Sequence, residues 1–91
     1  MNVAYVIVMY DVAEGRVNKV FRICKKYLFH YQNSIFRGEI TPSKLVKLRN
    51  ELLSVIDEQE DFVCFLKCKN VHVFDEEVIG KSDENGESLL L

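Results

Sequence analysis

The chain has 91 residues, of which 48% are hydrophobic and 29% are charged, and its net charge is −2. This length predicts one small domain with a modest core, so we expect a homodimer that buries additional apolar surface. No stretch approaches the roughly 20 apolar residues of a membrane helix, and no basic residue precedes the apolar start as in a secretory signal, so we expect a cytoplasmic protein with no membrane partner.

The first predicted element is a strand. Residues 3–10 form an uninterrupted apolar run without helical periodicity, which is typical of a strand buried on both faces. Asp11 ends the run, and because ligands bind at the carboxyl ends of strands in open α/β sheets, it is a candidate metal ligand and catalytic residue. The alternative is a capping box with Glu14, in which Asp11 accepts a hydrogen bond from the next helix. One carboxylate cannot fully meet both roles.

Residues 12–29 predict an amphipathic helix. The apolar residues on one face are Val17, Val20, Phe21, Cys24 and Leu28. The opposite face is basic, and a stripe at this spacing can track a phosphate backbone. The candidate nucleic-acid-binding residues are Arg16, Lys19, Arg22 and Lys26 on this helix, together with Arg37 in the next segment. The alternative for the stripe is a solvated helix surface.

Residues 30–40 predict extended structure with a break or bulge, which Gly38 favours. The pattern leaves open whether this is one bent strand or two short ones. The side chains of residues 32–34 either contact a partner chain or nucleic acid, or satisfy backbone groups at the strand break. His30 is a distant candidate for a general base, and its alternative is a satisfied structural histidine.

A second helix is predicted at about residues 42–56, where Thr41 supplies a capping hydroxyl and Pro42 suits the first helical position. The apolar residues expected to be buried are Leu45, Leu48, Leu52, Val55 and Ile56.

The remaining chain predicts an acidic loop at residues 57–61, an apolar strand at 62–68 and a less regular extended segment at 71–79. We expect one domain over residues 1–80 and a disordered tail over residues 81–91, because the tail is polar until its three terminal leucines.

The cysteines Cys24, Cys64 and Cys68 are more typical of small buried hydrophobes than of metal ligands. Residues four apart on an extended strand lie about 13 Å from each other, which is too far for one tetrahedral zinc ion.

The order strand, helix, extended pair, helix, strand predicts an α+β, ferredoxin-like βαββαβ sandwich with an additional C-terminal strand. A surplus strand commonly covers an edge of its own or a partner's sheet, which is a second reason to expect a homodimer.

The net charge conceals a partition along the chain. Between residues 16 and 49 nine residues are basic and one is acidic, whereas from residue 50 onward eleven acids outnumber three lysines. Such asymmetry favours a polyanion as the partner of the first half. The alternative is a pair of ordinary solvated helix faces.

Four segments together carry a family pattern: residues 5–11 (YVIVMYD), 16–20 (RVNKV), 31–41 (YQNSIFRGEIT) and 77–80 (EVIG). In this combination the chain resembles the CRISPR-associated protein two family, the small adaptation nucleases. The resemblance covers about residues 3–80. The chain departs from the family after the first strand, where Glu14 stands in a loop that often carries basic residues.

The resemblance implies a ferredoxin-like homodimer in which the Asp11 carboxylates of both protomers face each other across the twofold axis. It implies a magnesium (Mg²⁺)-dependent endonuclease acting on single-stranded RNA or duplex DNA, and a scaffold that bridges dimers of the CRISPR-associated integrase (protein one) during spacer acquisition. One Asp per chain is a small number of ligands for Mg²⁺, but two Asp residues related by symmetry would suffice. With no obvious general base, we expect low activity.

Three functions are therefore considered: a metal-dependent nuclease, a nucleic-acid scaffold, and a ferredoxin-like regulatory module that binds a small ligand. We favour scaffold and weak nuclease together. Whether the substrate is RNA or DNA depends on a site geometry that the sequence does not give.

Overall fold

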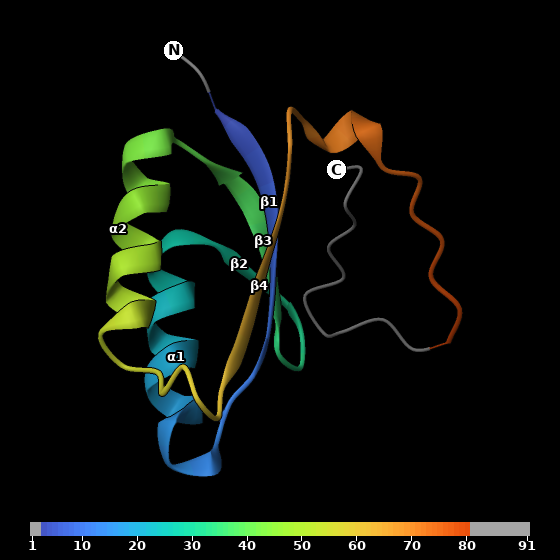
Figure 1. Cartoon of the computed structure of the whole chain (residues 1–91). Helices are drawn as coiled ribbons and strands as arrows, with labels where there is room; N and C mark the ends of the chain where they lie inside the picture. Colours follow the sequence, from blue (N-terminus) through green and yellow to red (C-terminus); the bar gives the residue numbers. More distant parts are fainter. Residues whose placement is uncertain (1–2, 81–91) are drawn as a thin grey trace.

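The computed structural model describes residues 3–80 and places two helices on one face of an antiparallel four-stranded sheet (Figure 1). The elements in chain order are β1 (Ala4–Asp11), α1 (Glu14–Tyr27), β2 (Phe29–Gln32), β3 (Ile35–Ile40), α2 (Pro42–Leu53), β4 (Phe62–Cys68) and the 3₁₀ helix η1 (Val71–Val73). The strand order β2-β3-β1-β4 confirms the predicted ferredoxin-like topology. The predicted disordered tail, residues 81–91, lies outside the described residues.

The core lies between the helices and one face of the sheet. Alternate residues of β1, beginning at Val6, point toward the helices and are buried there against Val20 and Cys24 of α1. On the other face of β1, Ile7 and Met9 are only half-buried in the single chain. The sequence predicts that this strand is buried on both faces, and in the single chain its burial is complete only on the face toward the helices.

Residues 30–40 form two strands rather than one. The chain turns between them at Asn33, which has a φ of +45°, a left-handed conformation that asparagine tolerates better than most residues. Gly38 lies instead inside β3 with a φ of +153°, and a Cβ added there would meet Leu28 Cδ2 at 3.4 Å. Gly38 therefore allows the Leu28 side chain to approach β3 closely, whereas the break between the two strands lies at Asn33.

The helix α2 begins as predicted and ends earlier than predicted. The Thr41 hydroxyl accepts a hydrogen bond from the Lys44 amide at 3.3 Å, and Pro42 occupies the first turn. The helix stops at Leu53, and the Ser54 hydroxyl donates to the Glu51 carbonyl at 2.7 Å, which satisfies an orphan acceptor of the last turn. Val55 and Ile56 nonetheless pack against the core from the following turn.

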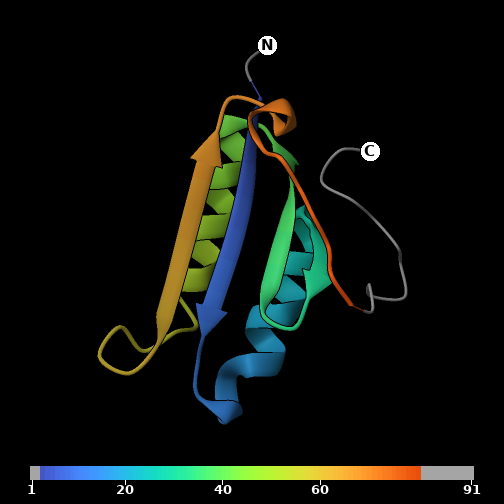
Figure 2. The same cartoon turned by 90° about the vertical axis from the view of Figure 1, so that its right-hand side faces the viewer.

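The additional C-terminal strand is not formed by the described part of this chain, where η1 follows β4 and residues 74–80 form no strand. The cause lies at Asn70, whose side-chain oxygen accepts the His72 amide at 2.9 Å and whose carbonyl accepts the Val73 amide at 3.4 Å. These bonds turn the chain off the sheet before a fifth ladder can begin. Residues 74–80 then pass over the face that carries no helix (Figure 2).

Two tyrosines of the sheet, Tyr5 and Tyr31, hold that segment on it. The ring of Phe74 lies 6.1 Å from that of Tyr5, and the Tyr31 hydroxyl donates to Glu76 at 2.8 Å.

In residues 3–80 no helix has the length and hydropathy needed to cross a bilayer.

Candidate functional site

Asp11 is exposed at the end of β1 and lies on the sheet face opposite the helices. It pairs with Phe62, the first residue of β4, in the antiparallel ladder. The alternation of β1 produces this position, because the residue before Asp11, Tyr10, is buried in the core on the helix side. Asp11 thus presents its carboxylate at the end of a strand, as predicted.

The capping box considered for Asp11 does not form, because Ala13 rather than Asp11 is the N-cap of α1. Helix α1 has Ala13 at its N-cap, with no side-chain capping bond of its own. Asp61, 48 positions away, accepts the Ala13 amide on Oδ1 at 2.9 Å. Asp11 therefore has no competing duty at the helix terminus.

Asp61 is the centre of a polar cluster that we call the clasp, formed by Ala13, Arg16, Asp57 and Asp61. Its side chain is 0% exposed, and the Arg16 guanidinium donates to it through Nε at 2.6 Å and Nη2 at 3.0 Å. The Asp57 amide donates to Oδ2 at 2.9 Å. The bonds from Arg16, and then those from the Asp57 and Ala13 amides, hold the pKa of the Asp61 carboxyl well below its usual range.

The sequence predicted an acidic loop at residues 57–61 but no role for Asp61. The only local signal is an acid directly before an apolar strand, and that pattern is too common to identify a partner 48 positions away.

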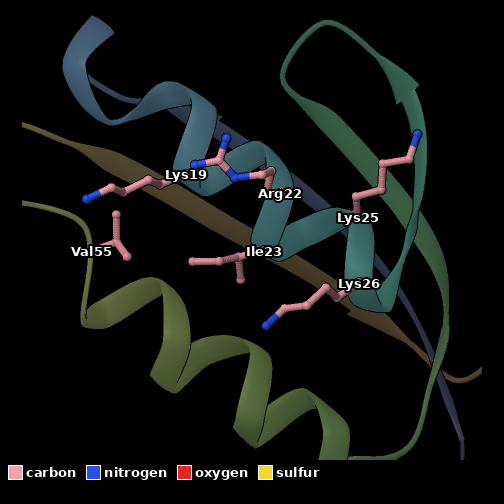
Figure 3. Close-up of a pocket in the computed structure, with 6 residues that line it drawn as sticks. All are labelled: Lys19, Arg22, Ile23, Lys25, Lys26 and Val55. Atoms are coloured by element: carbon pink, nitrogen blue, oxygen red, sulfur yellow. The ribbon is translucent and has the colours of Figure 1, made fainter.

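The basic side chains of α1 line an open groove of about 590 Å³ beside the turn that follows α2. Ile23 and Val55 supply apolar lining, and Figure 3 shows them between Lys19 and Lys26. The residues that line the groove are Lys19, Arg22, Ile23, Lys25, Lys26 and Val55. Four cations around one groove form a surface that suits a phosphate backbone.

Lys26 is shared between the groove and the helix packing. Its ammonium group binds the Glu51 carboxylate of α2, which also accepts the Tyr27 hydroxyl. Glu51 raises the pKa of Lys26, and Lys26, followed by Tyr27, lowers the pKa of Glu51. Lys26 therefore stays charged while it ties α1 to α2.

The structure brings together only part of the predicted nucleic-acid set. Lys19, Arg22 and Lys26 share the groove, and Lys25 joins them although the sequence analysis did not select it. Arg16 is held by Asp61 and by Glu60, whose Oε1 lies 3.1 Å from Nη2.

Arg37 lies apart from the groove. It is 3% exposed in β3 and its guanidinium carbon lies 4.5 Å from the centre of the Tyr31 ring. Because it pairs with Ile7 of β1, it faces the side of the sheet that carries no helix. A role for Arg37 in binding nucleic acid stays a prediction.

His30 is placed on the helix side of the sheet, opposite to Asp11. Its ring lies 4.9 Å from that of Phe21 and 5.0 Å from that of Phe36, and its Nε2 is 2.9 Å from the Asn33 carbonyl oxygen. These contacts fit the structural alternative for His30.

Residues 3–80 contain no group of three His, Cys, Asp or Glu side chains that could hold a metal ion. Cys24 is buried, and burial raises the pKa of its thiol to about 12, so it behaves as a core hydrophobe. Asp11 offers the hard oxygen donor that Mg²⁺ prefers, and a second copy of Asp11 would complete a minimal carboxylate pair. Within the described residues of one chain Asp11 is therefore a single hard ligand, and a second carboxylate for Mg²⁺ would have to come from another chain.

The lowered pKa of Asp61 carries a prediction for acid stability. A carboxyl with a lower pKa in the folded than in the unfolded chain stabilises the fold above the unfolded value of about 3.9, and this is lost as pH falls through the folded value. We expect the thermal unfolding midpoint of the wild type to fall more steeply below about pH 5 than that of Asp61→Asn, which starts roughly 5 °C lower at neutral pH. Circular dichroism melts across this range measure both curves, and parallel curves would contradict the assignment.

Comparison with known proteins places this geometry in context. Residues 4–75 match the family model described as CRISPR associated protein Cas2. A CRISPR-associated endoribonuclease Cas2 of Thermodesulfovibrio yellowstonii is 49% identical over 80 residues, covering 88% of this chain and 91% of the relative. The CRISPR-associated endoribonuclease Cas2 of Thermotoga maritima is 46% identical over 76 residues, covering 84% of this chain and 87% of the relative.

A solved structure agrees. The crystal structure of a Cas2 protein superposes with a TM-score of 0.85 at 37% identity, covering 96% of this chain and 98% of that one.

Proposed function

Because this chain belongs to the Cas2 family of CRISPR-associated proteins, we propose that it acts in spacer acquisition as a homodimeric nucleic-acid scaffold with weak Mg²⁺-dependent endonuclease activity. The observation that carries the proposal is Asp11, exposed at the end of β1 on the sheet face that carries no helix, with no part in capping α1. The relatives named as endoribonucleases support the nuclease activity.

The sheet face that carries no helix supports the homodimer. It carries Leu66, 45% exposed, and Phe62, 57% exposed, beside the half-buried Ile7 and Met9. A second copy packed on this face would remove these side chains from water and would bring two Asp11 carboxylates toward one axis. Residues 74–80 form no ladder in the described chain, and in a dimer they would leave their contacts with Tyr5 and Tyr31 to pair with an edge of the partner's sheet.

Mg²⁺ held between two Asp11 carboxylates would supply Lewis-acid stabilisation of a scissile phosphodiester and an activated water. The protein's own contribution is to hold the two carboxylates in place. His30 is turned into the helix side of the sheet, away from Asp11, so we propose that it is not the general base and that the reaction is slow.

The groove on α1 supports the scaffold role. It lies in the helix layer, so a dimer joined through its sheets would carry one such groove on each outer side. Nucleic acid bound there would leave the Asp11 pair free, which separates binding from cleavage. We propose that bound duplex DNA and dimers of the CRISPR-associated integrase assemble on these outer surfaces.

Substitution of Leu66 by lysine tests the dimer and the nuclease together. Leu66 lies on the edge strand β4 and pairs with Ile7 on the face that carries no helix, so an ammonium group buried there by a partner would oppose association. We expect the wild type to sediment as a dimer and to cleave single-stranded RNA or duplex DNA with Mg²⁺ but not with chelator. Leu66→Lys should sediment as a folded monomer and lose at least about 90% of that cleavage, since Mg²⁺ needs both carboxylates.

The control is Val46→Lys, an exposed apolar residue of α2 in the other layer, which should remain a dimer with wild-type cleavage. A monomeric wild type, or a monomeric variant that cleaves at the normal rate, would overturn the twofold site. Absence of both cleavage and salt-sensitive binding would favour a ferredoxin-like regulatory module instead.

A further inference from the structure

We propose that Asp61 is a positioning residue for Asp11, and that the clasp fixes the turn between β1 and α1 so that the Asp11 carboxylate stays where metal and phosphate bind. This inference rests on the proposed function of Asp11. Asp61 lies in the loop before β4, and its side chain is buried. Its part in the reaction would therefore be indirect, through Asp11.

The contacts of Asp61 lie on both sides of Asp11. Asp61 directly precedes Phe62, which is the ladder partner of Asp11, so backbone pairing connects the loop to the strand end. Two residues beyond Asp11, the Ala13 amide is bonded to the Asp61 carboxylate at 2.9 Å. The short segment that carries Asp11 is therefore held at both ends by the same stretch of chain.

This turn needs an external support because its own sequence gives little. Ala13 cannot cap α1 with its side chain, and Gly15, the second helical residue, is a poor helix former with open space around its α-carbon. Without the clasp the first turn of α1 would fray easily, and the end of β1 would move with it.

The charges of the clasp make it specific for a carboxylate. Asp61 accepts four hydrogen bonds from donors of Ala13, Arg16 and Asp57, and every donor faces an oxygen. Each oxygen of Asp61 accepts two of these bonds, so an asparagine at this position would turn an N–H₂ group toward two donors while keeping the size of the side chain. Arg16 thus supports the position of Asp11 through its bonds to Asp61, in addition to the positive charge that it carries.

The test compares Asp61→Asn with wild type in two measurements, Mg²⁺-dependent cleavage and direct Mn²⁺ binding followed by electron paramagnetic resonance. We expect the half-saturating Mg²⁺ concentration to rise about tenfold, kcat to fall about tenfold and Mn²⁺ to bind about tenfold more weakly, as losses of supporting residues around metal ligands do. Hydrogen exchange of the Ala13 amide should accelerate at the same time.

The matched control is Thr41→Ala, which removes the N-cap of α2 at a site remote from the turn after β1. It should lower the unfolding midpoint as Asp61→Asn does and leave kcat and Mn²⁺ binding unchanged, because a merely structural loss moves stability alone. Arg16→Lys provides a second variant that keeps the charge and loses the forked contact, and it should show a smaller shift in the same direction.

The outcomes separate this inference from the function on which it rests. A wild type that does not cleave, or whose cleavage is unaffected by Asp11→Asn, overturns the proposed function. If Asp11→Asn abolishes cleavage while Asp61→Asn and Arg16→Lys keep wild-type kcat and Mn²⁺ affinity, the positioning role is overturned and the nuclease stands. Should Asp61→Asn fail to fold, Arg16→Lys alone decides.

Discussion

Replacement of Asp11 by asparagine is expected to lower the rate of Mg²⁺-dependent cleavage by roughly 10³-fold while the dimer remains folded and bound to duplex DNA. The size follows from the loss of both charged ligands of a symmetric site, since a metal ion supplies several kcal/mol of charge stabilisation and each 1.36 kcal/mol is about tenfold in rate. The dimer should persist because Asp11 is exposed at the end of its strand and contributes no burial to the core.

Cleavage of single-stranded RNA and duplex DNA should be measured side by side, with Mg²⁺ and with chelator. The control is Glu14→Gln, which removes the same charge three positions later, from an exposed residue in the first turn of α1. That variant should cleave within about twofold of wild type. Equal loss in both variants would show that the local negative charge, rather than a metal ligand, is what matters.

The elements with local signals could be predicted from the sequence. The apolar run that ends at Asp11 gave β1, and the hydroxyl and ring of Thr41 and Pro42 gave the start of α2. The element order then specified the sheet, since few topologies join these elements without a crossed connection. Asp11 as an exposed acid at a strand end was predictable for the same reason.

The interactions between distant segments could not be predicted. Asp61 and Ala13 are 48 positions apart, and only the register of β4 against β1 brings them together. Arg16 has the helical spacing of the basic stripe, but periodicity alone could not show that its guanidinium group binds Asp61. Arg37 lies against Tyr31, a contact that depends on the pairing of β2 with β3.

The groove itself carries the second large prediction. Reversal of Lys19 and Arg22 together to glutamate is expected to weaken duplex binding by at least about 10²-fold at 0.1 M salt, because two phosphate contacts become repulsions. Arg16 is left unchanged, since a glutamate there would face Asp61 inside the clasp and unfold the turn. The two substitutions lie on the exposed side of α1 and should leave the core, and hence the unfolding midpoint, nearly unchanged.

Binding should be titrated at several salt concentrations, because the slope of affinity against salt counts the neutralised phosphates. The slope should fall by roughly 2 for each groove in contact with the duplex. The control, Lys67→Glu with Lys69→Glu, makes the same change in net charge at exposed positions near the end of β4 and outside the groove, and should keep most of the affinity. If both double variants lose affinity and slope equally, binding follows the total charge of the protein, and the groove on α1 has no special part in it.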